Sequence, residues 1–172
     1  MADITFNTTA GAVVERKLLL LYLNTGSSDA PTWKVLGKRV EDSSMEYDWG
    51  DESKTDILGD TYSTMKTPVI TQTFDPCELD SGDEAQLKIW KQSIQQQDIA
   101  AMCSNDLLVV HAYTGTPETG AFAERYPASM VKPSGLGGSS NVGMPVDVTL
   151  GGKRSTGVAK TSGGVLTFTE DE

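Results

Sequence analysis

Residues 107–113 read LLVVHAY, and this stretch decides the kind of fold that the chain can adopt. It lacks the polar alternation of a strand with one face in water, so it predicts a strand that is covered on both faces. Residues 17–23, which read KLLLLYL, show a similar pattern. We expect both strands to be covered by a second sheet, a helix or a neighbouring subunit.

In other stretches apolar and polar residues alternate with a period of two, which is typical of a half-buried strand. The strand predicted at residues 43–50 is one example. Its apolar Met45, Tyr47 and Trp49 share one face, and acidic side chains share the other. Three further stretches are typical of strands, at residues 69–74, 145–150 and 165–169. The sequence therefore predicts a mainly β fold.

One segment is typical of a helix. Ser81 is followed three residues later by Glu84, which fits a capping box. No Gly or Pro interrupts residues 83–104, so a helix of about three to five turns is expected there. The apolar side chains that this helix would pack onto the sheet, as part of the core, are Leu87, Trp90 and Ile94.

A chain of 172 residues predicts a single domain. Two long irregular stretches interrupt its strands. Residues 50–67 predict an extended hairpin or loop with a turn near Gly59-Asp60, and residues 133–144 are rich in Gly and Ser. Loops of this length are uncommon in a compact domain unless they have a function.

Nearly all of the excess charge lies in one quarter of the chain. The formal net charge is −10, and residues 41–84 hold 13 of the 24 acidic residues but only two of the 14 basic ones. Such a segment repels a polyanion at close range, which argues against sequence-reading DNA binding. The plainer alternative is a solvated acidic loop that only aids solubility.

The chain offers no recognisable active site. Its one histidine, His111, lies inside an apolar strand, without a G-x-S-x-G elbow or a papain-like cysteine. Cys77 and Cys103 fit neither a zinc spacing nor a redox pair. Asp147 stands where a Walker loop needs Gly, and Ser140 breaks a dinucleotide fingerprint. We therefore expect a non-enzymatic protein that binds no metal and no cofactor.

The first residues lack the basic start and the apolar stretch of a signal peptide. The longest apolar run, residues 18–23, is too short to span a membrane. We therefore expect synthesis in the cytosol, free cysteines and no insertion into a membrane.

In its order of segments the chain resembles the major tail tube proteins of siphophages, the long-tailed bacteriophages, particularly those of Gram-positive hosts. The likeness covers roughly residues 15–170. It lies in the order of the segments and in short stretches of sequence rather than in an invariant motif. The segments that carry it are WKVLG (33–37), MEYDWGDESKTDILGDTYST (45–64), TPVITQTFDP (67–76), the predicted helix and LLVVHAY (107–113).

The resemblance implies a tail-tube-type β-sandwich or small barrel flanked by one helix. Six copies would form a ring whose strands join into a continuous β-barrel, and stacked rings would form the tube through which viral DNA leaves the virion. Tape measure, tail tip and tail terminator proteins are the implied partners, and DNA would pass without specific binding.

Two segments match parts of the family that reach neighbouring subunits: residues 48–67 match a long joining loop, and residues 133–172 match a C-terminal arm. An acidic lining would let DNA slide, because carboxylates repel its phosphates. The candidates for the channel lining or the contact between rings are Glu46, Asp48, Asp51, Glu52 and Asp56.

Three alternatives stay open. The first is the inner tube of a contractile tail, a tail-like bacteriocin or a secretion tube. The second is a host- or glycan-binding β-module, for which Trp33, Trp49 and Trp90 are the large aromatic candidates. Trp49 and Trp90 fall on apolar faces, where core positions are expected. The third is an enzyme whose paired carboxylates meet only in the folded chain.

Overall fold

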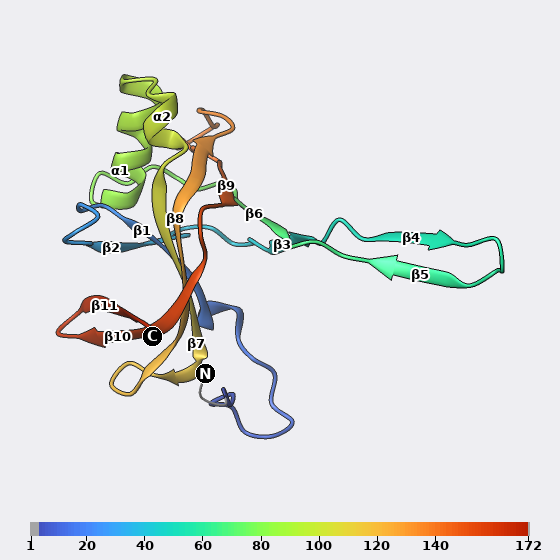
Figure 1. Ribbon diagram of the computed structural model, residues 1–172. Coiled ribbons are helices and arrows are strands. Elements are labelled where there is room, and N and C mark those ends of the chain that lie inside the picture. The colour runs from blue at the N-terminus through green and yellow to red at the C-terminus, as the bar shows by residue number, and fades with distance from the viewer. Residues whose placement is uncertain (1–3, 172) are drawn as a thin grey trace.

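A curved sheet carries a helical segment on one side and sends a long hairpin far out on another (Figure 1). The figure shows a computed structural model in which residues 4–171 are described. Nine strands form the main sheet, and β4 (Glu52–Thr55) and β5 (Thr61–Thr64) form a separate two-stranded sheet in the hairpin. The prediction of a mainly β fold with one helical region is confirmed.

All the strands of the main sheet pair in antiparallel fashion, in the order β2-β1-β7-β8-β9-β6-β3, and β10 and β11 are attached through β8. Within residues 4–171 the sheet does not close into a barrel. The strands are β1 (Leu19–Asn24), β2 (Trp33–Leu36), β3 (Met45–Asp48), β6 (Val69–Phe74), β7 (Asn105–Thr116), β8 (Gly120–Pro133), β9 (Val146–Leu150), β10 (Ser155–Ser162) and β11 (Val165–Glu170).

The sheet divides along β8. The first half of this strand pairs with β10, with Ala121 opposite Ala159. Its second half pairs with β9, with Val131 opposite Val148. β7 pairs with β8 from Gly120 to Ser129, before the part of β8 that pairs with β9.

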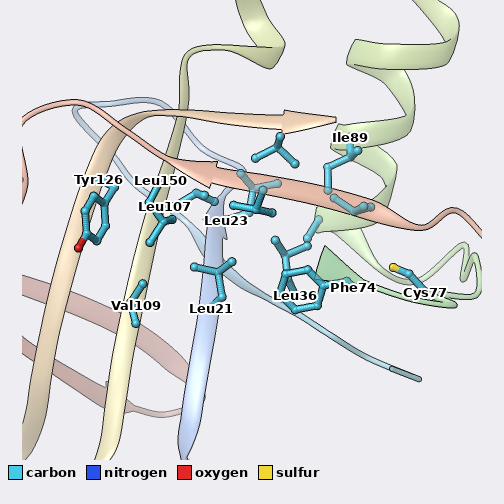
Figure 2. Packing of buried hydrophobic residues seen from close by; sticks show 14 of the residues in the cluster. Leu21, Leu23, Leu36, Phe74, Cys77, Ile89, Leu107, Val109, Tyr126 and Leu150 are labelled. Carbon is cyan, nitrogen blue, oxygen red and sulfur yellow. The ribbon is translucent and has the colours of Figure 1, made fainter. Parts of the chain in front are cut away.

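The two faces of β7 feed two separate hydrophobic clusters. Leu107 and Val109 belong to the larger cluster, and Leu108 and Val110 belong to the smaller one, all of them buried. The prediction that both faces of this segment are covered is therefore confirmed. In Figure 2 the larger cluster gathers side chains from β1, β2, β6, β7 and the helix, among them Leu21, Leu23, Leu36, Phe74 and Ile89.

The helical segment begins at Asp83 rather than at the predicted Ser81. The side chain of Asp83 accepts hydrogen bonds from the backbone N–H groups of Ala85 at 3.0 Å and Gln86 at 3.1 Å, which is what an N-cap does. The elements are α1 (Glu84–Trp90), a π-helical turn η2 (Lys91–Gln95) and α2 (Ile99–Met102), preceded in the chain by the 3₁₀ turn η1 (Arg16–Leu18).

The predicted apolar stripe of the helix is partly wrong. Leu87 and Ile94 are each 38% exposed, whereas Trp90 packs against the edge of the larger cluster. Ile89 is the large apolar side chain of this helix that is fully buried, at 1% exposure. The buried positions Gln86, Ile89 and Ser93 recur at helical spacing, one residue before each member of the predicted stripe, so the period was right and the face was misplaced by one position.

None of the helices in residues 4–171 combines the length and the apolar character of a membrane span.

Candidate assembly interface

A hairpin carries the chain away from the body of the fold (Figure 1). Its base is β3 paired with β6 in the main sheet, and its far end is β4 paired with β5. Between them, the N–H group of Lys66 donates to the carbonyl of Trp49 at 2.9 Å and continues the ladder. We call residues 50–67 the arm. The predicted extended hairpin is therefore what the structure shows, and every residue of β4 and β5 is exposed.

The tip of the arm is an ordered turn that presents two aliphatic side chains. Oδ1 of Asp56 accepts hydrogen bonds from the N–H groups of Leu58 at 2.8 Å and Asp60 at 3.0 Å. Gly59 has a φ of +88°, a conformation that glycine adopts without strain. The turn holds Ile57 and Leu58 in water, at 101% and 82% exposure. Such a pair, held in place by the backbone, favours contact with another molecule.

The two faces of the arm differ in chemistry. One face carries hydroxyl groups paired across the strands, with Ser53 and Ser63 at 2.8 Å and Thr55 and Thr61 at 3.2 Å. The other face includes Tyr62, which is 54% exposed. Neither face is covered by the body, so the arm is a two-stranded hairpin on its own, which is only marginally stable in water.

An aromatic pair lies where the arm leaves the body. The rings of Tyr47 and Trp49 stack with centroids 6.1 Å apart and planes at 16°. They are 44% and 46% exposed, so the core position expected for Trp49 is wrong. The reason is topological: β3 is the last strand of the sheet, and its apolar face is covered only near Met45.

The candidate acidic residues are all exposed and lie along the hairpin in a line rather than in a cluster. Two of them hold the backbone: Asp48 accepts from the N–H group of Gly50 at 2.9 Å, and Asp56 organises the tip. Glu52 lies 3.6 Å from Lys54, an exposed ion pair of little energetic weight. From base to tip the acids are Glu46, Asp48, Asp51, Glu52 and Asp56.

The sheet ends in strands that have a free edge. In residues 4–171, β2 and β3 end the main path and β11 ends the branch. Each presents one row of N–H and C=O groups that no other strand of the described part of the chain pairs. Exposed aliphatic side chains lie on two of these strands, Val35 on β2 at 41% and Val165 on β11 at 64%. Such edges favour strand pairing with another chain.

A buried polar cluster surrounds Glu124 on β8. Its carboxylate contacts Nε2 of His111 at 2.8 Å, accepts from the hydroxyl of Tyr126 at 2.8 Å and accepts from Nε of Arg154 at 2.6 Å. Nδ1 of His111 contacts the hydroxyl of Tyr113 at 2.7 Å. Burial raises the pKa of Glu124, but the hydrogen bonds from His111, Arg154 and Tyr126 outweigh it and lower that pKa to about 2. The same contacts occupy both ring nitrogens of His111.

The cysteines of the chain are free thiols, with Cys77 buried and Cys103 exposed. Burial raises the pKa of Cys77. No group of three or more His, Cys, Asp or Glu side chains in the described residues is placed to hold a metal ion.

Sequence reasoning missed two features. The sequence could have indicated the exposed aliphatic pair at the arm tip, because Ile57 and Leu58 lie between acidic residues in a polar segment. The cluster around Glu124 had no such indication in the sequence, because its partners come from residues 111, 113, 126 and 154 and meet only through strand pairing.

No protein-family model matches the chain, and no curated protein matches it either. Among solved structures, the tube-terminating cap of the anti-feeding prophage is 12% identical with a TM-score of 0.47, over 88% of this chain and 95% of that one. In the sheath–tube complex of the PVC extracellular contractile injection system, in its extended state, one chain is 10% identical with a TM-score of 0.49, over 87% and 94%. A chain of the sheath/tube terminator of the same system is 11% identical with a TM-score of 0.46, over 86% and 99%. All three TM-scores lie below 0.5, so the case for assembly rests on the geometry of the chain itself.

Proposed function

We propose that the chain is a structural subunit of a phage-type tail tube, which assembles with its own copies into stacked rings around a channel for viral DNA. The observation that carries this proposal is the arm. It extends away from the body, is exposed on both faces and ends in an aliphatic tip in water. A neighbouring copy supplies the surface that the arm lacks within its own chain.

The free sheet edges support the same proposal. Pairing of β2 or β3 with a strand of the next copy would satisfy the backbone groups of both edges. A head-to-tail contact repeated around a closing rotation gives a ring, and an axial contact that does not close gives a filament. Six copies per ring, joined into a continuous β-barrel, follow from the resemblance to siphophage tail tube proteins.

The acidic residues of the hairpin fit a conduit for DNA. Carboxylates facing a channel repel the phosphates of DNA, whereas cations would hold them. Repeated around a ring, a few such side chains would line the wall with negative charge. We assign this role, or a role in the contact between rings, to some members of the set Glu46, Asp48, Asp51, Glu52 and Asp56.

In this proposal the protein acts by assembly and not by catalysis. It is made in the host cytoplasm and ends in the tail of the virion. There it meets tape measure, tail tip and tail terminator proteins. The inner tube of a contractile tail would be built through the same contacts between subunits. A sheath around the purified particle would distinguish a contractile tail from a non-contractile one.

One observation favours a second candidate function, a glycan-binding β-module. Stacked Tyr47 and Trp49 present aromatic surface at the base of the arm, and sugars bind to such surfaces. Binding of the soluble monomer to a glycan array, with loss of binding in Trp49→Ala, would support this function over the tube.

Negative-stain electron microscopy of the concentrated protein tests the tube. We expect rings or tubes, with sedimentation velocity showing the same assemblies in solution. A matched variant replaces residues 52–64 with a short Gly-Ser turn, which leaves the main sheet intact because the arm does not pack on it. This variant should stay monomeric. A wild-type chain that remains monomeric at high concentration, even with the tape measure and tail tip proteins, would contradict the proposal.

A further inference from the structure

A groove lies on the body beside the base of the hairpin. It encloses about 470 Å³ between β1, β2, the segment after β2 and β6. Its apolar lining includes Leu21, Leu36 and Phe74, which also belong to the larger hydrophobic cluster shown in Figure 2. Val35 and Val40 extend the apolar lining. The groove is an open extension of the core, and its volume is in the range of sites that hold small apolar groups.

The rim of the groove is mainly cationic. Arg16, Lys17 and Lys38 line it, against a single acid, Glu41. Lys17 and Lys38 have carboxylate partners within the chain, Glu15 at 2.6 Å and Asp80 at 2.8 Å. The guanidinium of Arg16 instead donates to backbone carbonyls, those of Ser43 at 2.7 and 2.9 Å and of Leu19 at 2.6 Å.

Arg16 therefore carries a charge that no carboxylate in residues 4–171 pairs with. Its side chain is exposed, and hydrogen bonds to the carbonyl of Ser43 hold the guanidinium beside the groove. The groove thus favours an occupant that is aliphatic at its centre and acidic at its edges.

The tip of the arm has this chemistry. Ile57 and Leu58 are aliphatic and highly exposed, and they lie between Asp56 and Asp60 in the sequence. Asp56 is engaged in the turn, whereas the carboxylate of Asp60 makes no ion pair within residues 4–171. An aliphatic pair with acidic flanks complements an apolar groove with a cationic rim in both respects.

The groove and the tip of one copy cannot meet. The groove lies at the base of the hairpin, since Ser43, Gln72 and Phe74 line it, and the tip lies at the opposite end (Figure 1). An extended strand from Trp49 to Ile57 covers about 26 Å, a distance comparable to the width of a small domain. The tip therefore reaches past its own body toward a neighbouring one.

We propose that the groove of one copy receives the tip of the arm of a second copy, with Ile57 and Leu58 against its apolar lining and Asp60 toward Arg16. This inference rests on the proposed assembly and names the surface that the arm engages. The contact joins two different patches, so each copy gives a tip and receives one, which propagates around a ring or along a stack.

Disulfide trapping tests the contact in the assembled protein. In a Cys103→Ser background, one preparation carries Leu58→Cys at the tip and another carries Val35→Cys in the groove. The two are mixed under assembly conditions and mildly oxidised. Ile99→Cys replaces Val35→Cys in the control, because Ile99 is 66% exposed and lies on α2, away from the groove. We expect the tip–groove heterodimer to form at least about tenfold faster than the control pair, since docking raises the effective concentration of the two thiols.

The outcomes separate this inference from the tube itself. Rings or tubes in which the tip–groove pair cross-links no faster than the control would overturn the docking site and leave the tube standing. Faster cross-linking of the tip to Ile99→Cys would also overturn it and place the contact on the helix. Samples that hold neither rings, tubes nor cross-linked pairs would overturn both proposals.

Discussion

Nε of Arg154 donates a hydrogen bond to Oε2 of Glu124 at 2.6 Å. The bond joins the turn between β9 and β10 to β8, the strand along which the sheet divides. Tyr126 and His111 contact the same carboxylate, so one buried acid connects β7, β8 and the turn. Because a buried charge that loses its partner costs about 3–5 kcal/mol, we infer that this cluster fixes the geometry of the branch.

The first prediction concerns stability in acid. The pKa of Glu124 is about 2 in the folded protein, against an ordinary value of 4.5. A carboxylate whose pKa is lower in the folded state stabilises that state fully at pH values above its unfolded pKa. This stabilisation is lost as the pH falls through the folded pKa. We expect the free energy of unfolding to fall by about 3 kcal/mol from this group between pH ~4.5 and ~2. Urea unfolding at a series of pH values measures it.

Two variants make this prediction specific. Glu124→Gln should flatten the pH dependence in that window, because its side chain does not titrate. Glu118→Gln, at an exposed turn position, should keep the wild-type slope. An unchanged slope in Glu124→Gln would show that other carboxylates govern acid unfolding.

The second prediction concerns the buried face of the helix. Ile89→Ala removes a side chain that is 1% exposed and packed in the larger cluster, so it should lower the free energy of unfolding by about 2–5 kcal/mol. Leu87→Ala, at a position that is 38% exposed, should cost less than about 1 kcal/mol. Chemical denaturation of the two variants compares them. Equal losses would mean that the helix also packs through the predicted stripe that includes Leu87.

These residues mark how far the sequence could predict the structure. The strands followed from period-two patterns, and the burial of both faces of residues 107–113 followed from their unbroken apolar character. The helix was found, but its buried face was placed one residue too late, because the polar Gln86 and Ser93 occupy buried positions that a count of apolar residues does not mark.

The candidate interface was predicted only in outline. Residues 50–67 were expected to form an extended hairpin or loop, and they form a hairpin. The exposure of Tyr47 and Trp49 was not foreseen, because alternation tells which side chains share a face but not whether another element covers it. The cluster around Glu124 depends on pairing among distant segments, which a single sequence does not specify.

The third prediction concerns the tip of the arm. Replacing Ile57 and Leu58 together with Ser should leave the free energy of unfolding within about 0.5 kcal/mol, because neither side chain touches the body. Assembly should require at least about tenfold more protein, since the apolar area buried at the contact is lost. Sedimentation velocity over a concentration series measures the shift. Val13→Ser, at 93% exposure in the N-terminal segment, is the control and should assemble normally.

The fourth prediction concerns the acidic side chains. Glu46, Asp51 and Glu52 are exposed and, unlike Asp48 and Asp56, do not hold the backbone through a turn. Reversing the three to Lys should leave the monomer folded and impair tube assembly or the ejection of DNA, because the wall of the channel or the ring contact changes sign. Circular dichroism measures the folding of the monomer, and electron microscopy measures tube assembly. An assay on virions complemented with the variant measures the ejection of DNA. Wild-type behaviour would reduce the acids to a solubility feature.

The fifth prediction concerns the order that assembly gives to two segments. The backbone of residues 48–67 is exposed, and the loop at residues 133–144 is held by two bonds between Gly137 and Gly143, at 2.6 and 3.0 Å, and a few contacts to residues 77–79. Both should open easily in the monomer except at the buried Gly143 and Met144, because the residues from 134 to 142 and most of those from 48 to 67 are exposed. Docking on a neighbour should slow their amide hydrogen exchange by at least about tenfold, whereas the amides of β7 should exchange slowly in both states. Mass spectrometry of monomer and tube compares them. Exchange that is equally slow in the two states would mean that the arm is rigid before it meets a partner, and the contact would then contribute no ordering.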